Sequence, residues 1–272
     1  MTAQAARFST PHADAPADAP PDARAGSPML TLDGVGKTFG AGNGTGTVAL
    51  TDVDLTVSPG ELVTVVGPSG CGKSTLLRLA AGLDRPTAGT LTTRTDAISY
   101  VFQDPTLLEW RTALGNVELA GHLTGVPRAQ RRREALAALE LVGLAGSEDR
   151  YPRELSGGMR MRVSLARALV REPELALFDE PFGALDEITR LTMQTELLRL
   201  FTTASFAAVF ITHSVSEAAY LSTRVLVMSG RPGRIVADVP VPWGRHRPPE
   251  LRYEPEFAAL TGEISAALGA HA

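Results

Sequence analysis

The 272-residue sequence contains one cysteine, Cys71, so no disulfide can form within the chain and a reducing compartment is expected. It has no uninterrupted apolar run of the roughly 18 residues that a membrane-spanning helix needs. Its N-terminal stretch lacks the apolar segment of a secretory signal. The formal net charge of −4 argues against a nucleic-acid-binding protein, which usually needs a basic face. If a membrane matters, we expect the protein to dock on a partner embedded in it.

Both ends of the chain differ in character from the part between them. Residues 1–28 are rich in alanine, proline and aspartate and have almost no large apolar side chains, so burial cannot offset the entropy cost of ordering them. We predict a disordered N-terminal tail there and an ordered domain at 29–241. Residues 242–272 contain no motif that we can interpret, and we predict a C-terminal tail with a packing or regulatory role.

The hydrophobic pattern predicts an α/β domain with a helical insert. Alternating residues in MLTL, from Met29, and in VALTDVDLTV predict strands of an antiparallel edge layer, joined by the glycine-rich loop 40–46. The short apolar run ELVTVVG is typical of a buried parallel strand, and helical spacing follows it. From Asp104 to about Ser156 the spacing becomes helical. Further strands are expected at 97–102, 175–179, 207–212, 224–229 and 234–239.

A glycine-rich loop, GPSGCGKST, lies between the predicted strand and helix. Its glycines permit a tight turn whose N–H groups point at phosphate oxygens, and the helix N-terminus adds a favourable dipole. Lys73 would reach the β- and γ-phosphates of ATP, while the Ser74 hydroxyl would bind Mg²⁺. The predicted nucleotide-binding loop comprises Gly67, Pro68, Ser69, Gly70, Cys71, Gly72, Lys73, Ser74 and Thr75.

Two adjacent carboxylates end the apolar run LALFDE. A strand that ends in this way delivers acidic groups to the edge of the sheet where α/β proteins bind ligands. Asp179 would hold Mg²⁺ through water, and Glu180 would act as the general base on the attacking water. On its own such a pair is often a solvated turn, so the interpretation depends on the phosphate loop.

A second glycine turn, LSGGM, begins a predicted helix about twenty residues before these carboxylates. Two glycines at a helix start form an anion-binding turn, although a Ser-Gly-Gly triplet alone is usually only a loop. Its place about twenty residues before the Asp179–Glu180 pair is what favours a functional role for this turn.

From Met29 to about Val241 the chain resembles the nucleotide-binding subunits of ABC transporters. It shows a Walker A loop (GPSGCGKST), a Q-loop glutamine (Gln103 in VFQD), the signature LSGGM, a Walker B (LALFDE), a D-loop (184–186) and a switch histidine (His213 in ITHS). The resemblance implies a P-loop NTPase (RecA-like) core with an antiparallel β edge layer and a helical ABC-specific subdomain at about 104–160. LLEWRTALGNV and VMSGRPGRIV look like the importer subfamily for nitrate, sulfonate, taurine and related anions.

The resemblance also implies roles for single residues. Phe39 would stack on adenine, and Gln103 would contact the Mg²⁺ and water region and relay its state to the helical insert. His213 would bond the γ-phosphate and position Glu180 with its water. Two subunits would pair head to tail, so that the signature turn of one closes on the nucleotide of the other. The residues of this closing turn are Ser156, Gly157 and Gly158, and Asp186 of the D-loop is counted with them among the nucleotide-binding residues.

The implied assembly is a homodimer of ATPase subunits at the cytoplasmic face of the membrane, bound to integral-membrane permease subunits near Trp110 and Arg111. A periplasmic or lipid-anchored substrate-binding protein would act indirectly, and no nucleic acid takes part. Met159, Met161 and Ser214 depart from the commoner residues at their positions. Two alternatives stay open, a soluble ABC ATPase not coupled to transport and an exporter ATPase subunit. The transported substrate is not encoded in this chain.

Overall fold

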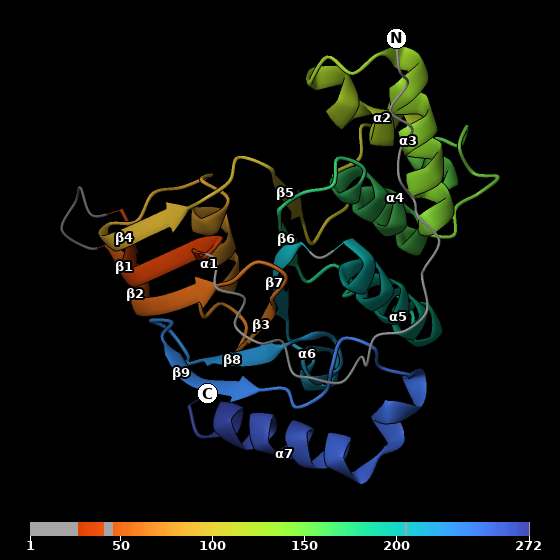
Figure 1. The fold of residues 1–272 in the computed structure, drawn as a ribbon. Helices are drawn as coiled ribbons and strands as arrows, with labels where there is room; N and C mark the ends of the chain where they lie inside the picture. Colours follow the sequence, from red (N-terminus) through yellow and green to blue (C-terminus); the bar gives the residue numbers. More distant parts are fainter. Residues whose placement is uncertain (1–26, 41–45, 205, 272) are drawn as a thin grey trace.

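A computed structural model describes residues 27–40, 46–204 and 206–271 (Figure 1). All but the last two residues of the predicted N-terminal tail, 1–28, lie outside the described residues. The same holds for most of the predicted glycine-rich loop 40–46. No helix among the described residues is long and apolar enough to cross a membrane.

The core of the fold is a six-stranded sheet with the order β5-β6-β7-β3-β8-β9. Neighbouring strands are parallel except for β9, which runs antiparallel to β8. Every residue of β3, β6 and β7 is buried, because other elements cover both faces of the sheet. The strands are β3 (Leu62–Val66), β5 (Ile98–Val101), β6 (Leu175–Asp179), β7 (Ala207–Thr212), β8 (Arg224–Met228) and β9 (Ile235–Pro240).

A three-stranded antiparallel sheet, ordered β2-β1-β4, forms the predicted edge layer. The sequence predicted β1 (Leu30–Phe39) and β2 (Thr47–Val57) but not β4 (Ala88–Thr93). β4 has the sequence AGTLTT, none of whose residues is buried, so it lacks the apolar alternation that marks a strand. It is recruited by pairing with β1, for example Leu32 opposite Leu91.

The first helix, α1 (Lys73–Ala80), lies between the two sheets and fills the space that they enclose (Figure 1). Its leucines Leu76, Leu77 and Leu79 belong to one apolar cluster with residues of β1, β2, β3, β6, β7 and β8. The start of α1 is therefore fixed by packing on both sides, which positions the glycine loop that precedes it.

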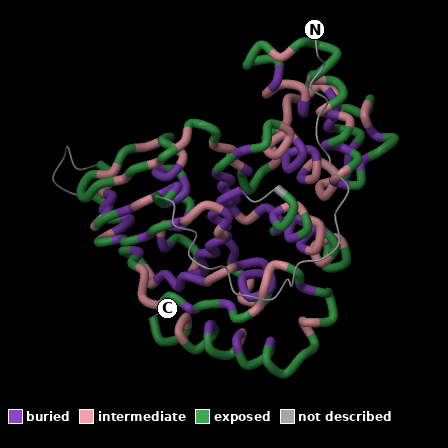
Figure 2. Tube along the Cα trace, in the orientation of Figure 1, coloured by how far each residue is buried: buried purple, intermediate pink, exposed green. Residues whose placement is uncertain are grey.

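The remaining helices lie against the opposite face of the six-stranded sheet or form a lobe beside it (Figure 1). The lobe consists of α2, α3 and the N-terminal part of α4, which pack on one another. It corresponds to the predicted helical subdomain of 104–160, although α4 continues beyond that range. Buried segments concentrate in the sheets and on the inner sides of the helices (Figure 2). The bounds are α2 (Ala113–Leu123), α3 (Arg128–Leu141), η2 (Pro152–Glu154), α4 (Gly157–Leu169), α5 (Glu187–Ala204) and α6 (Val215–Leu221).

The C-terminal segment differs from the predicted tail of 242–272. It forms η3 (Pro249–Tyr253) and α7 (Pro255–Gly269), and α7 packs along α6, β8 and β9. Phe257, Leu260 and Ile264 are buried in the same apolar cluster as the sheet. Their spacing of three and four residues places them on one helix face. The ordered unit therefore extends through residue 271 instead of ending at Val241.

Candidate functional site

The glycine loop has a backbone shape that larger residues cannot easily adopt. Gly70 and Gly72 have φ angles of 75° and 113°. A Cβ on Gly72 would lie 2.7 Å from the Leu50 Cδ2 atom and 2.8 Å from the Ala49 carbonyl oxygen, so only glycine fits there. Lys73 Nζ donates hydrogen bonds to the carbonyl oxygens of Gly67 (2.8 Å) and Pro68 (2.9 Å). The ammonium group thus lies within the curve of the loop, where it can meet an anion.

A cavity of about 370 Å³ opens beside this loop. Its size is within the range of sites that hold a small organic ligand. A second hollow, of about 460 Å³, lies at 146–154 and is lined by three carboxylates and one cation, Arg150, so its charge is less favourable for phosphate. The cavity beside the loop is lined by Phe39, Thr47, Ala49, Ser69, Gly70, Gly72, Lys73, Ser74, Thr75, Gln103, Glu180 and Arg231.

Ser74 and Asp179 meet at the end of β6. The Ser74 Oγ atom lies 3.0 Å from the Asp179 Oδ1 atom, and the Tyr100 hydroxyl donates to Asp179 Oδ2 at 3.2 Å. Burial raises the pKa of the Asp179 carboxyl, while the two hydrogen bonds oppose that effect. A hydroxyl and a carboxylate oxygen at this distance are the hard donors that Mg²⁺ prefers, so the residues present fit the ion. Tyr100 was not predicted from the sequence.

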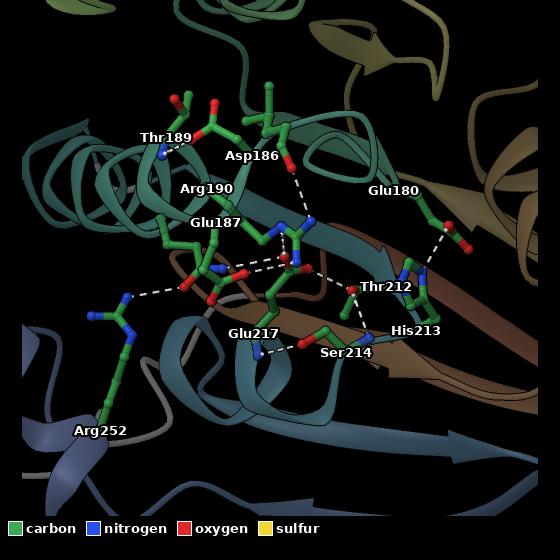
Figure 3. A network of polar contacts seen from close by, with 12 residues as sticks. Glu180, Asp186, Glu187, Thr189, Arg190, Thr212, His213, Ser214, Glu217 and Arg252 are labelled. Atoms are coloured by element: carbon green, nitrogen blue, oxygen red, sulfur yellow. Dashed lines mark hydrogen bonds and ion pairs between the residues drawn. The ribbon is translucent and has the colours of Figure 1, made fainter. Parts of the chain in front are cut away.

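Glu180 and His213 come together from the ends of adjacent strands β6 and β7. The His213 Nδ1 atom lies 3.1 Å from Glu180 Oε2, and the tautomer of the ring decides which atom carries the proton (Figure 3). Glu180 has a φ of 44°, a left-handed conformation that is unfavourable for a residue with a side chain. Its N–H donates to the Ile211 carbonyl oxygen at 3.0 Å, which holds it there. Such strain at a strand end is typical of functional sites.

The segment after Gln103 is attached to α4. Gln103 is exposed and lines the cavity. Two residues later, the Arg167 guanidinium of α4 donates to the carbonyl oxygens of Pro105 and Thr106, both at 2.9 Å. Thr106 has a φ of 46°, so these bonds stabilise a turn that is unfavourable on its own. The helix that begins at the LSGGM turn therefore also fixes the path of the chain after Gln103, a link that the sequence did not indicate.

The LSGGM turn and the D-loop pack on each other, away from the cavity. The Ser156 Oγ atom accepts from the Met159 N–H at 3.2 Å and caps α4. A Cβ on Gly158 would lie 3.2 Å from the Leu185 Cδ2 atom. Asp186 Oδ1 accepts from the Thr189 N–H at 2.9 Å. Within the part of the chain that the structure describes, the cavity lining includes none of the predicted residues Ser156, Gly157, Gly158 and Asp186.

Some other predicted residues also lie apart from the cavity surface. Cys71 is 1 % exposed and its side chain packs in the apolar cluster around α1, so only its backbone can serve the loop. Met161, which departs from the commoner polar residue, is fully buried, and an apolar side chain suits that position. Ser214 caps α6, because its Oγ atom accepts from the Glu217 N–H at 3.3 Å.

The sequence did not predict a role for Arg231, which lines the cavity from the loop between β8 and β9. Two hydrogen bonds attach this loop to β2. The Gly233 N–H donates to the Ala49 carbonyl oxygen at 2.9 Å, and the Thr51 N–H donates to the Gly233 carbonyl oxygen at 3.1 Å. The signal was the segment VMSGRPGRIV, which the resemblance connected to a subfamily without giving a role to any of its residues.

An exposed loop before α2 is held in shape by one buried side chain, Asn116. Its Oδ1 atom accepts from the Leu108 N–H at 2.7 Å, and its Nδ2 atom donates to the carbonyl oxygens of Leu108, Arg111 and Thr112 at 3.0–3.2 Å. Trp110 lies in this loop and is 74 % exposed. Large exposed aromatic rings are enriched where proteins bind one another.

Comparisons with known proteins agree with this geometry. A family model described as ABC transporter matches residues 50–183. An uncharacterized ABC transporter ATP-binding protein of Methanocaldococcus jannaschii is 46% identical over 212 residues, 75% of this chain and 79% of the relative. An aliphatic sulfonates import ATP-binding protein of Mesorhizobium japonicum is 45% identical over 245 residues, 88% of each chain. Another aliphatic sulfonates import ATP-binding protein, of Rhodopseudomonas palustris, is 45% identical over 240 residues, 86% of this chain and 81% of the relative.

A solved structure supports the same assignment. It shows a dimeric ATP-binding cassette in a post-hydrolysis state, bound to ADP and phosphate, with a TM-score of 0.70 and 32% identity. The match covers 78% of this chain and 99% of the solved one. The resemblance stated from the motifs is thus confirmed over most of the sequence. With the glycine loop, the paired carboxylates and the histidine in one place, the chain belongs to the ABC transporter family, as one of its ATP-binding ATPase subunits.

Proposed function

We propose that this protein hydrolyses ATP to energise an importer for small anions, of which aliphatic sulfonates, taurine and nitrate are the candidates. The observation that carries the proposal is the Glu180–His213 pair, which lies at the sheet edge beside the glycine loop with Glu180 facing the cavity. Relatives at 45% identity carry names that specify aliphatic sulfonate import, which supports the choice of substrate class.

ATP would be held by the loop and the cavity around it. The positive-φ glycines turn backbone N–H groups toward the phosphates, and the Lys73 ammonium supplies a charge-assisted contact. Phe39, at the end of β1, is 42 % exposed and lines the cavity, so its ring is available to stack on adenine. Arg231, in the loop between β8 and β9, adds a second cation to the wall of the cavity.

Mg²⁺ would be held by Ser74 and, through water, by Asp179, with Gln103 beside them. When bound, the ion neutralises negative charge on the phosphates. Tyr100 has a positioning role, because its hydroxyl fixes the second oxygen of the Asp179 carboxylate. Ser74 and Asp179 come from α1 and β6, so their contact aligns the glycine loop with the sheet edge.

Glu180 would remove a proton from the attacking water, and His213 would orient both Glu180 and the γ-phosphate. The carboxylate is 21 % exposed at its side chain and the imidazole 64 %, so water can reach the pair. The unfavourable φ of Glu180 keeps its carboxylate at the end of the strand, where the nucleotide would lie.

The position of the LSGGM turn supports a dimer with composite sites. Its serine and glycines do not line the cavity of their own subunit, which supports the proposal that they complete the site of another copy. A head-to-tail pair in which each subunit supplies this turn to its partner forms a closed two-fold assembly. The dimeric solved cassette is consistent with that arrangement.

The exposed loop around Trp110 is the proposed contact with the integral-membrane permease at the cytoplasmic face. Asn116 presents a pre-organised loop, so little ordering entropy is lost when a partner binds it. A periplasmic or lipid-anchored binding protein would deliver the anion to the other side of that permease.

Steady-state ATP hydrolysis by the Glu180→Gln variant tests the catalytic proposal. Loss of a general base lowers turnover by roughly 10²–10⁴-fold, while ATP affinity should persist because the loop is untouched. A variant that binds ATP and hydrolyses it at the wild-type rate would refute the role of Glu180. Growth of a strain without this chain on an aliphatic sulfonate, taurine or nitrate as the sole nutrient source tests the substrate class. Unimpaired growth on all three would reject that class.

A further inference from the structure

A buried carboxylate, Glu217, lies directly behind the histidine of the candidate site. It belongs to the first turn of α6 and is 6 % exposed. Burial raises the pKa of Glu217, which shows that the site is unfavourable for a carboxylate without partners. Two of its partners are labelled in Figure 3: the Thr212 hydroxyl lies 2.5 Å from Oε2, and Arg190 Nε lies 3.8 Å from Oε1. A third partner, Gln194 Nε2, lies 3.2 Å from Oε1.

The contact with Thr212 bears on the backbone that carries His213. The Thr212 hydroxyl donates to Glu217, so its lone pairs are free to accept the Ser214 N–H, which lies 3.0 Å away. The Ser214 hydroxyl in turn accepts the Glu217 N–H. His213 is therefore flanked on both sides by residues whose positions Glu217 fixes, while its imidazole reaches Glu180 on the outer side.

Gln194 of α5 connects Glu217 to the C-terminal segment. Its amide nitrogen donates to Glu217, and its amide oxygen accepts from Arg252 Nη2 at 3.0 Å. Gln194 is 3 % exposed, and the two contacts are satisfied by only one orientation of the amide. Arg252 belongs to η3, and its guanidinium lies over the ring of Tyr220, with the carbon 3.3 Å from the ring centroid. It is thus held in place by a cation–π contact as well.

Arg190 connects the same carboxylate to the D-loop. Arg190 donates from Nη2 to the Leu185 carbonyl oxygen at 2.9 Å, immediately before Asp186. Within the described part of the chain, its Nε atom is buried without a hydrogen-bond partner and lies at ion-pair distance, 3.8 Å, from Glu217 Oε1. A shift of Glu217 would therefore disturb two loops, the one that carries His213 at the candidate site and the D-loop that ends at Asp186.

We propose that the C-terminal segment positions the catalytic histidine, through the series of contacts Arg252–Gln194–Glu217–Thr212 that ends beside His213. Within the described residues, Arg252, Gln194 and Glu217 neither line the cavity nor hydrogen-bond to Glu180 or His213, although Glu217 interacts electrostatically with His213. They are therefore positioning residues. This inference rests on the proposed function of His213 and Glu180. It assigns a role to a segment in which the sequence showed no motif, and it makes turnover sensitive to anything that displaces η3.

ATPase kinetics of Arg252→Met and Gln194→Met in the full chain test the inference. We expect each to lower kcat by about tenfold, since small displacements of a catalytic group have effects of that order, with KM for ATP within about twofold of wild type. The double variant should be no slower than the slower single variant, because both break one series of contacts. Arg252→Lys, which keeps a donor, should recover part of the rate. Tyr253→Ala, its neighbour in η3 at 82 % exposure, is the matched control and should have no effect.

The outcomes separate this inference from the function on which it rests. Rates are measured below the thermal unfolding midpoint of each variant, with ATP binding by equilibrium titration as the check that it is folded. Folded Arg252 and Gln194 variants with wild-type kcat, or with multiplicative losses in the double variant, overturn the inference while the function stands. If His213→Ala hydrolyses ATP at the wild-type rate, the proposed function of the histidine fails and the inference with it. Should Arg252→Met not fold, Gln194→Met and Arg252→Lys decide the question.

Discussion

Replacing Gly233 by alanine should damage both the stability of the fold and the nucleotide site. Gly233 lies in the loop between β8 and β9, directly against the glycine loop. An added Cβ would lie 2.2 Å from the Cys71 carbonyl oxygen and 3.0 Å from the Met228 Sδ atom. The first of these is a contact with backbone, which cannot rotate away, so the two loops must separate by about 0.8 Å to reach a distance of 3.0 Å.

The magnitude follows from the cost of overpacking. Extra methyl groups in a well-packed region cost about 1–3 kcal/mol, and a contact with backbone places Gly233→Ala near 3 kcal/mol. For a domain of this size the midpoint of thermal unfolding should fall by roughly 6–12 °C. The movement also shifts the N–H groups that face the phosphates. Loss of one hydrogen bond to a charged group, about 1.5–3 kcal/mol, would weaken ATP binding by at least about tenfold.

Differential scanning calorimetry and equilibrium titration with ATP measure the two effects. Gly262→Ala is the matched control, because an added Cβ at Gly262 in α7 has no neighbour within 4 Å. That substitution should stabilise the helix by about 1 kcal/mol and leave ATP affinity unchanged. If Gly233→Ala unfolds at the wild-type temperature and binds ATP with wild-type affinity, the inferred contact between the two loops is wrong.

Three further substitutions probe the surroundings of the site. Arg231→Ala should raise KM for ATP by about tenfold with little change in kcat, since it removes a cation from the cavity wall. Arg234→Ala, exposed in the same loop, is the control. Equal KM values for the two variants would refute a role of Arg231 in binding ATP. Trp110→Ala should lower transport by the assembled complex, while the ATPase rate of the isolated subunit persists. Tyr253→Ala, at another exposed aromatic residue, is the control and should leave transport unchanged. Unaltered transport by Trp110→Ala would contradict a docking loop. Asn116→Ala should lower the free energy of unfolding by about 2–4 kcal/mol in urea titrations because it breaks a buried set of hydrogen bonds, and a loss below 1 kcal/mol would count against it.

The fold class and the main elements of the site could be predicted because their signals are local. The glycine loop, the apolar strand that ends in Asp179 and Glu180, and the LSGGM turn each express a requirement within a few residues of sequence. β4 could not be predicted, because its pairing with β1 and not its own side chains makes it a strand. The packed C-terminal helix was missed for a related reason: Phe257, Leu260 and Ile264 form an apolar face that has meaning only against β8, β9 and α6.

The sequence by itself determined which residues are the candidates for phosphate chemistry, since backbone freedom, charge and the order of motifs are properties of the chain. Only the tertiary structure decided how these residues are held. Several contacts join residues that lie tens of positions apart in the sequence: Tyr100 bonds Asp179, Arg252 bonds Gln194, and Arg231 lines the same cavity as the glycine loop. Such contacts arise where parallel strands end at one edge and distant helices pack together, and no local pattern encodes that packing.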